Sequence, residues 1–172
     1  ELARRPHPGI RFEVGREWQS RLRQHLPWER TAGQKRARRE ITEDMTAPRR
    51  MHRLLMGDVG TGKTVVALFA MLLAVENDYQ AALMAPTELL AEQHCATLTA
   101  LLAPLELKPE LLLGRLTAAE KTAARRRIAE GGARVIVGTH ALIQEDVRFR
   151  RLGLAVIDEQ HRFGVEQRAA LV

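Results

Sequence analysis

The stretch Gly57-Asp58-Val59-Gly60-Thr61-Gly62-Lys63-Thr64 decides the fold of this chain. It matches the phosphate-binding loop pattern G-x-x-x-x-G-K-[ST] at every fixed position. Such a loop needs glycines because its backbone must curl until several N–H groups point at one phosphate, and side chains would block that approach. In this pattern the lysine reaches the β and γ phosphates and the threonine hydroxyl binds Mg²⁺. We therefore expect the whole stretch to bind a nucleotide, with Lys63 catalytic and Thr64 a metal ligand.

The residues on both sides of this loop support the same interpretation. Residues 53–56 (RLLM) predict a short buried strand, and residues 65–75 predict a buried helix. A strand, a glycine-rich turn and the N-terminus of a helix form an arrangement that binds anions, because backbone N–H groups point at the ligand. We therefore favour nucleotide binding over the alternative, an ordinary glycine-rich turn.

A second apolar run, residues 154–157 (LAVI), predicts a buried strand that ends in two acids. We expect Asp158 to hold Mg²⁺ through a water, and Glu159 to orient and deprotonate the attacking water as a general base. The alternative, a solvated strand end, is disfavoured by the phosphate-binding loop upstream. Asp158 and Glu159 are therefore predicted to be catalytic, provided that they meet the loop at one Mg²⁺-triphosphate.

Gln34 has two interpretations. Thr31-Ala32-Gly33-Gln34 fits a helix capping box, because a Gln three residues after the N-cap folds back onto the N-cap amide. The side-chain amide of Gln34 also fits an adenine sensor, because it can pair with N6 and N7 of the base. Sequence chemistry alone favours the cap.

Length and composition fit one domain with a hydrophobic core, since 45% of the 172 residues are hydrophobic. No stretch reaches the roughly 18 uninterrupted apolar residues of a membrane span, and no secretory signal is visible. Cys95 is the single cysteine, which excludes a disulfide framework and a cysteine-based zinc site. These features predict a reducing, cytoplasmic location, with Cys95 as a small buried apolar residue.

Basic residues are concentrated in the N-terminal third. Residues 1–53 carry 14 Lys and Arg against 7 Asp and Glu, a net charge of +7, whereas residues 54–172 have a net charge of −1. A basic field of this kind attracts polyanions such as nucleic acid. A solvated helix face, or a surface that meets another part of a longer protein, explains the charge equally well.

The pattern of apolar residues predicts an α/β fold. A linker over residues 1–13 is followed by helices over 15–26 and 31–45. Further along, strands are predicted near 54–56, 81–85, 110–113, 134–137 and 154–157, with helices near 63–76, 88–102 and 118–130. The strands are continuously apolar, which is typical of a parallel sheet. We therefore expect a mostly parallel, doubly wound sheet with helices on both faces, preceded by N-terminal helices.

Four blocks of this sequence resemble a known family. They are residues 57–64 (GDVGTGKT), 82–94 (ALMAPTELLAEQH), 137–142 (VGTHAL) and 158–168 (DEQHRFGVEQR). Asp158-Glu159-Gln160-His161 is similar to the DExH box of superfamily 2 helicases. The blocks together resemble bacterial RecG, the family of ATP-dependent branched-DNA helicases, from about residue 16 onward. The transcription-repair coupling translocases are the second candidate. They rank below RecG because they are expected to carry a second Glu where this chain has Gln160.

The resemblance implies a RecA-like P-loop NTPase lobe that uses ATP and Mg²⁺, and it adds further site residues. It places Trp28 and Gln34 in the adenine-recognition element, where Gln34 can be a sensor as well as a cap. Backbone contacts with DNA, independent of its sequence, are implied for Pro86, Thr87, Thr139 and His140. Thr87 is also expected to be the N-cap of a helix, and His140 is alternatively an ordinary surface or core histidine. Gln160 and His161 are implied to couple the ATP site to the rest of the motor.

The resemblance also implies parts that this chain lacks. We expect a second RecA-like lobe, with the arginine that completes the ATP site, and a wedge domain that splits a DNA junction. We accordingly divide the chain into residues 1–27, a linker and helix leading into the motor, and residues 28–172, the first lobe. An arginine finger contributes about 10³ to 10⁵ in rate. The isolated chain is therefore expected to bind ATP–Mg²⁺ weakly and to hydrolyse it very slowly.

Two other function classes remain open on the sequence. One is a nucleotide-dependent switch or small-molecule kinase, although no substrate lid or acceptor site is recognisable beside Asp158 and Glu159. The other is a DNA-binding module with a vestigial ATP site. A motor needs both ATP turnover and DNA binding, so variants that separate the two activities discriminate among these hypotheses.

Overall fold

The structure, a computed structural model, describes residues 9–15, 17–27, 29–57 and 62–158. Its elements in chain order are α1 (Glu17–His25), α2 (Ala32–Thr46), α3 (Lys63–Glu76), β1 (Gln80–Met84), α4 (Glu88–Leu102), the 3₁₀ turn η1 (Ala103–Leu105), β2 (Glu110–Leu112), α5 (Ala118–Glu130), β3 (Val135–Gly138), the 3₁₀ turn η2 (His140–Ile143) and β4 (Leu152–Ile157). All five predicted helices and four of the five predicted strands lie at or near these positions, and only η1 and η2 were not predicted. The alternation of strands and helices is therefore confirmed.

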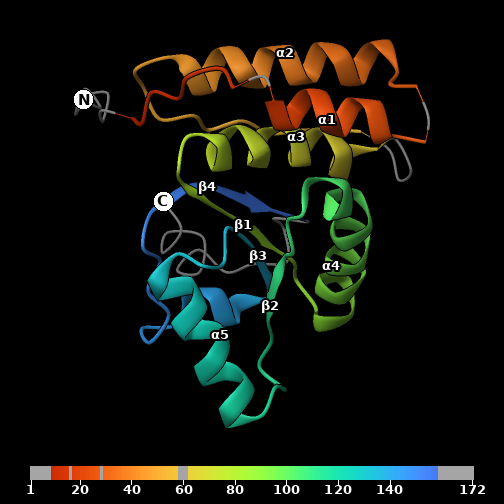
Figure 1. The fold of residues 1–172 in the computed structure, drawn as a ribbon. Helices are drawn as coiled ribbons and strands as arrows, with labels where there is room; N and C mark the ends of the chain where they lie inside the picture. Colours follow the sequence, from red (N-terminus) through yellow and green to blue (C-terminus); the bar gives the residue numbers. More distant parts are fainter. Residues whose placement is uncertain (1–8, 16, 28, 58–61, 159–172) are drawn as a thin grey trace.

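The described strands form one parallel sheet in the order β2-β3-β1-β4. In register, Leu83 of β1 lies between Val137 of β3 and Val156 of β4. Because all strands run the same way, their carboxyl ends meet at one edge of the sheet (Figure 1). This edge is where a doubly wound sheet binds its ligands.

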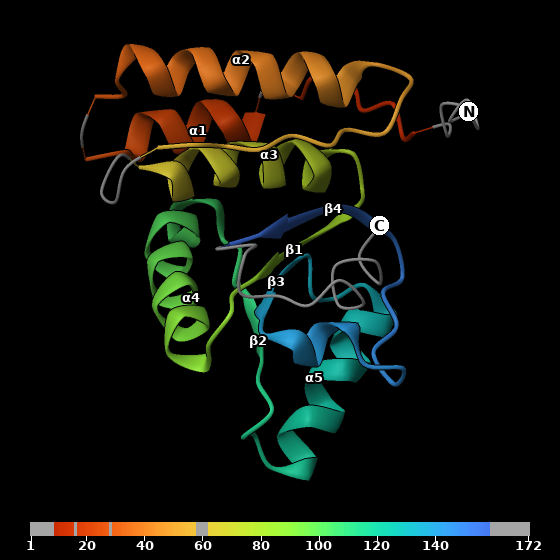
Figure 2. The same cartoon turned by 180° about the vertical axis from the view of Figure 1, so that it is seen from behind.

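Successive residues of β1 pack on opposite faces of the sheet. Leu83 belongs to a core cluster with Leu68 of α3 and Leu98 of α4, whereas Met84 belongs to a second cluster with Ile128 of α5. Helices α1 and α2 form a further layer over α3, as Figures 1 and 2 show. The prediction of helices on both faces, preceded by N-terminal helices, is confirmed.

Helix α3 is buried around most of its circumference. Leu68, Met71 and Leu72 have no exposed surface, because the sheet covers one side of α3 and the α1–α2 layer covers the other. A helix that is apolar on all sides needs such a central position. At its far end, Glu76 accepts hydrogen bonds from the backbone N–H groups of Trp18 (2.9 Å) and Gln19 (3.2 Å), so the end of α3 caps the start of α1.

Local capping signals fix where three helices begin. Thr31 and Gln34 form a reciprocal capping box at α2, and Thr117 and Glu120 form another at α5. Glu120 accepts hydrogen bonds from the backbone N–H and the hydroxyl of Thr117. Both bonds lower the pKa of its carboxyl group, the backbone bond more than the hydroxyl bond. At α4, the Thr87 hydroxyl accepts from Leu90 N (3.3 Å). The caps of α2 and α4 were predicted from the sequence and are confirmed.

The predicted strand at residues 54–56 is wrong. Residues 51–57 are extended but belong to no strand, and Leu54 and Met56 are 71% and 81% exposed. Arg53 binds Asp44 (Nε–Oδ2 2.7 Å) and Glu40 (Nη1–Oε2 2.9 Å), so two carboxylates hold this segment along α2. An apolar run of this length does not distinguish a sheet strand from an extended surface segment.

Two smaller expectations also need correction. The predicted linker is wrong for residues 9–13, because Phe12 is 5% exposed, donates its backbone N–H to Met45 O (3.1 Å) and packs edge-on against Tyr79. Cys95 is half-buried rather than buried, and that partial burial raises the pKa of its thiol. The N-terminal segment therefore contributes to the core.

Gln80 ties three separate parts of the sheet together from a buried position. Its Nε2 donates to Ile128 O (2.9 Å) and Ala133 O (2.7 Å), and its Oε1 accepts from Arg151 N (2.9 Å). The side chain thus joins the start of β1 to the end of α5 and to the entry of β4. All its hydrogen-bonding groups are used, which is what a buried amide requires.

We expect Gln80→Leu to destabilise the protein by about 2–4 kcal/mol, because the buried Ala133 carbonyl would lose its Gln80 donor and the Ile128 carbonyl and the Arg151 N–H would each lose one hydrogen bond. Urea unfolding followed by circular dichroism measures this change. The matched control is Gln144→Leu at an exposed position. A loss below about 0.5 kcal/mol, the range of ordinary surface substitutions, would contradict the role assigned to Gln80.

Candidate ATP-binding site

The N-terminus of α3 has the geometry of an anion site. Gly62, its N-cap, has a φ of +77°, a left-handed conformation that favours glycine. Its carbonyl accepts from Val65 N (3.1 Å) and Val66 N (3.4 Å), and no side chain of the described residues caps the helix. The first N–H groups of α3 therefore remain available to a ligand, and the helix dipole favours an anion there.

Lys63 closes the phosphate-binding loop on itself. Its Nζ donates to the backbone carbonyl of Gly57 (2.7 Å), which joins the last and the first part of the motif. The Lys63 side chain is exposed, whereas Thr64 is half-buried. A lysine held by a carbonyl at the mouth of the loop can exchange that neutral acceptor for a phosphate oxygen, which forms a stronger charge-assisted hydrogen bond.

Gln34 lies directly against the phosphate-binding loop. Its Oε1 accepts from Thr31 N (3.0 Å) in the capping box. Its Nε2 occupies the space where a Cβ on Gly62 would stand. One side chain therefore serves the α2 cap through its oxygen and faces the loop through its nitrogen. The cap is confirmed, and the adenine-sensing role of Gln34 stays a prediction.

Asp158 continues β4 at the carboxyl edge of the sheet. Its backbone N–H donates to Met84 O (2.9 Å). Its carboxylate Oδ2 lies 2.8 Å from Nε2 of His94, a residue in the middle of α4. The Asp158 and His94 side chains are 32% and 18% exposed, so this carboxylate is partly shielded yet open to a ligand on one side.

The two halves of the predicted site lie at the same end of the molecule. In both views α3 begins and β4 ends on the side where the carboxyl ends of the strands meet (Figures 1 and 2). This arrangement is the one that a shared Mg²⁺-triphosphate needs. The convergence of Lys63, Thr64 and Asp158 on one such ligand stays a prediction.

Several predicted site residues lie outside the residues that the structure describes. They are Trp28, Asp58, Val59, Gly60, Thr61, Glu159, Gln160 and His161. Their roles stay predictions from the sequence. Among the described residues, the site consists of Gln34, Gly57, Gly62, Lys63, Thr64 and Asp158.

The residues predicted to contact DNA follow two neighbouring strands. Pro86 and Thr87 come after β1, Thr139 and His140 come after β3, and Ala85 N bonds Gly138 O (2.8 Å) between them. Thr87 and His140 are exposed. Thr139 is only 2% exposed, and its hydroxyl has no partner among the described residues. The burial of Thr139 does not favour a DNA contact through its side chain, and the other three contacts stay predictions.

His94 is the residue that the sequence analysis missed. It lies within the block of residues 82–94 that carries the family resemblance, and helical periodicity places it two turns from the start of α4. Nothing in that spacing reveals a contact with Asp158, which lies 64 residues further along the chain. The contact depends on α4 folding back over the carboxyl edge of the sheet.

Comparison with known proteins identifies the family of this chain. The model of the DEAD/DEAH box helicases matches residues 31–172. The chain belongs to this family. The match begins at Thr31, the N-cap of α2, and it includes the phosphate-binding loop and the acids at the end of β4.

Within this family the chain is similar to RecG proteins. It is 53% identical over 147 residues to the ATP-dependent DNA helicase RecG of Synechocystis sp.. The aligned residues make up 86% of this chain and 18% of that protein. It is 45% identical over 169 residues to RecG of Thermotoga maritima. This alignment includes 98% of this chain and 22% of that protein. The resemblance to RecG seen in the four sequence blocks is confirmed. The chain spans about a fifth of the length of these relatives.

Solved structures agree with the sequence comparison. A structure of RecG bound to a three-way DNA junction superimposes with a TM-score of 0.86 at 44% identity, over 92% of this chain and 22% of that one. The DUF1998 helicase MrfA, bound to DNA and AMPPNP, gives a TM-score of 0.66 at 16% identity over 89% of this chain. The second likeness supports the fold alone. The RecA-like fold class is therefore confirmed.

Proposed function

We propose that this chain is the first RecA-like lobe of an ATP-dependent helicase or translocase that remodels branched DNA. The observation that carries the proposal is the placement of the N-terminus of α3 and the end of β4 at one edge of a parallel sheet, in a chain similar to RecG. Residues 28–172 form the lobe, and residues 1–27 lead into it. Replication forks and recombination or repair junctions are the substrate class, in a bacterial cytoplasm.

The described residues fit ATP with Mg²⁺. The left-handed Gly62 and the uncapped start of α3 suit a phosphate group, and Gln34 beside the loop suits an adenine edge. No three acidic, His or Cys side chains among the described residues gather into a metal cage. That fits Mg²⁺, which is usually bound by one or two protein ligands together with phosphates and waters. Thr64 and Asp158 would hold it, and the ion would neutralise charge on the phosphates.

We assign roles to the individual residues from their sequence motifs, together with this placement for the described ones. Lys63 would bind the β and γ phosphates and Asp158 would hold the metal, while His94 contacts one carboxylate oxygen of Asp158. Glu159 takes the proton of the attacking water. The second lobe of the same polypeptide supplies the arginine that completes the site. His161 and Gln160 transmit the state of the nucleotide to that lobe.

DNA is the proposed partner, bound through its backbone. Thr87 at the N-cap of α4 and His140 after β3 are exposed on adjacent connections. The first N–H groups of α4 there suit a phosphate. Backbone contacts carry no base code, so binding is independent of sequence.

As for the membrane, no described helix combines the length and apolar character that a span requires.

The test is ATP hydrolysis by the complete protein with and without DNA. We expect a forked or junction DNA to stimulate turnover well above linear duplex of equal length, because the motor acts where strands separate. Affinity for DNA should fall steeply with salt, roughly one power of concentration per phosphate contacted. Binding of DNA without any effect on ATP hydrolysis would instead favour a DNA-binding module. Hydrolysis that ignores DNA but responds to a small acceptor would favour a kinase.

A further inference from the structure

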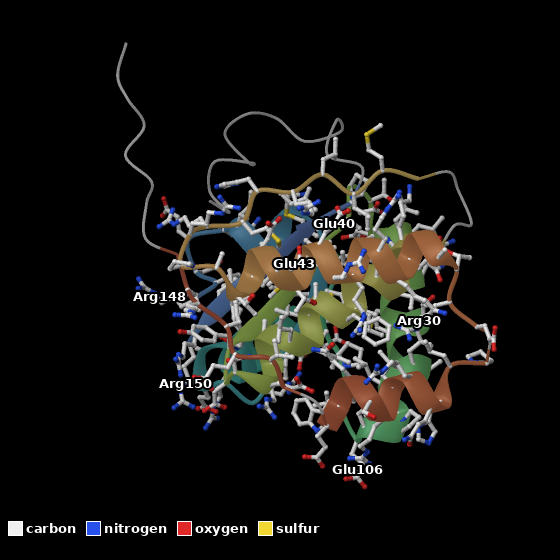
Figure 3. The ribbon with its side chains drawn as sticks, turned by 90° about the horizontal axis from the view of Figure 1, so that it is seen from above. Arg30, Glu40, Glu43, Glu106, Arg148 and Arg150 are labelled. Atoms are coloured by element: carbon white, nitrogen blue, oxygen red, sulfur yellow. The ribbon has the colours of Figure 1, made fainter. Side chains whose placement is uncertain are left out.

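Three arginines of the N-terminal layer lie close together. Arg23 is in the last turn of α1, Arg38 is in α2, and Arg30 lies in the connection between them. Figure 3 shows Arg30 in the space between α1 and α2. The guanidinium groups of Arg30 and Arg38 each lie 5.3 Å from the ring centre of Phe69 in α3. Arg30 and Arg38 therefore pack on the same aromatic ring, and Arg23 is near enough to both to act on their charges.

These arginines have no acidic partner among the described residues. Within the described chain, the Arg38 side chain makes a single hydrogen bond, donated by Nη1 to Gln19 Oε1 (3.0 Å), and no ion pair involves Arg23 or Arg30. Arg53 on the other side of α2 binds two carboxylates. The Glu76 carboxylate lies against Gly15 and accepts from Gln19 N (3.2 Å), but within the described chain no ion pair joins it to the three arginines.

Donor groups in this cluster are buried without acceptors. Within the described chain, Arg30 Nη1, Arg38 Nε and Gln19 Nε2 have no hydrogen-bond partner, although each atom is shielded from solvent. Gln19 is only 4% exposed as a whole residue. A buried donor without an acceptor is destabilising, and a charged one more so.

The charges of this cluster oppose one another. Burial lowers the pKa of Arg38 below its usual value, and the neighbouring Arg30 and Arg23 lower it further. Burial likewise lowers the pKa of Arg30, with Arg23 as the second cause. The contacts with Phe69 offset part of this repulsion, since a cation over an aromatic face is attracted to it. An anion would relieve it directly.

A cavity opens beside the cluster. It has a volume of about 400 Å³ and is lined by Val14, Gly15, Gln19, Ser20, Arg23 and Arg38. None of these residues belongs to the phosphate-binding loop or to the capping box of α2. The cavity therefore offers a second place, separate from the predicted ATP site, where an anion can meet the guanidinium groups.

We propose that Arg23, Arg30, Arg38 and Gln19 form a second phosphate-binding pocket between α1 and α2. A phosphate group matches the donors better than a carboxylate, because it presents more oxygens and more charge to three guanidinium forks. The phosphate is either free or part of a DNA backbone, and both have the same chemistry. The pocket does not depend on the function proposed for the loop at α3.

The competing explanation is that the arginines only pack on Phe69. The two explanations predict opposite effects of Arg30→Met, which keeps an unbranched apolar side chain over the ring and removes the charge. In chloride buffer the variant should melt higher than the parent if repulsion and the unpaired donor dominate. It should melt lower if the cation–aromatic contact is what matters.

The experiment is thermal unfolding of the complete protein in phosphate and in chloride at equal ionic strength. At about five times the dissociation constant, phosphate should raise the melting temperature of the unfolding transition of this lobe in the parent by about 2–4 °C. Arg30→Met and Arg38→Met should each abolish most of this rise. Arg36→Met, at an exposed position of the same helix, is the control and should keep it.

A Lys63→Ala background separates this pocket from the phosphate-binding loop. We expect the rise to survive in Lys63→Ala and to disappear when Arg30→Met is added. A rise lost in Lys63→Ala but kept in Arg30→Met and Arg38→Met would place all the phosphate at the loop and overturn the proposal. A lower melting temperature of Arg30→Met in chloride, without loss of the phosphate effect, would do the same.

A short single-stranded oligonucleotide distinguishes the two sources of the phosphate. If a DNA backbone occupies the pocket, the oligonucleotide should stabilise the parent at concentrations far below those of inorganic phosphate, and Arg38→Met should weaken its binding. If free phosphate is the ligand, only the inorganic ion should show an effect that depends on Arg38. If neither stabilises the parent beyond chloride, the pocket does not exist as proposed.

Discussion

Lys63→Ala is expected to reduce ATP turnover by the complete protein about 10²–10³-fold, the range for removing one preorganised charge donor from a reacting oxyanion. DNA binding should be largely kept. Steady-state hydrolysis in the presence of forked DNA measures the first effect, and fluorescence anisotropy of labelled DNA without nucleotide measures the second. Unwinding should be lost together with turnover.

The structure gives the reason for this separation. Lys63 Nζ bonds only the Gly57 carbonyl among the described residues, so its loss removes a phosphate ligand and leaves the α3 core unchanged. The predicted DNA contacts Thr87 and His140 lie on other connections. The control is Lys108→Ala, at an exposed position far along the chain. Loss of DNA binding with hydrolysis intact would reverse the order of our functional hypotheses.

Glu159→Gln is expected to lower hydrolysis about 10²–10⁴-fold, the usual contribution of a general base. ATP binding should be kept, because the amide has the same shape and the phosphate ligands Lys63 and Thr64 are untouched. Single-turnover hydrolysis gives the rate of the chemical step, and a fluorescent ATP analogue gives the affinity. The variant should therefore accumulate in the nucleotide-bound state.

A matched control for this change is Glu145→Gln, an exposed glutamate in the connection between η2 and β4. It makes the same chemical substitution at a residue outside the predicted site. Should Glu159→Gln bind ATP much more weakly while hydrolysing what it binds at the normal rate, Glu159 would be a ligand of the nucleotide and not its base. Another residue would then have to activate the water.

Local signals explain why much of the fold could be predicted. The bounds of α3, α4 and α5 agree with the sequence predictions, because caps such as Thr87 and Thr117 act within one helical turn. The parallel sheet followed from apolar runs that lack alternation. Each of these properties depends on residues that are neighbours in the sequence.

Long-range contacts explain the failures. Residues 54–56 carry the apolar character of a strand, but the ion pairs of Arg53 with α2 keep them extended at the surface. Phe12 looked like part of a linker because the residues it contacts, Met45 and Tyr79, are far along the chain. No periodicity within a short window contains that information.

The sequence by itself determined the phosphate-binding motif, the acids after β4, the helix caps and the family. Each of these is recognised from residues that are close together in the sequence. Only the tertiary structure decided that Gln34 faces Gly62, that His94 contacts Asp158, and that Arg30 and Arg38 both lie over Phe69. The physical reason is that packing brings these groups together across long stretches of chain. Charge and burial then act on them through space and not along the backbone.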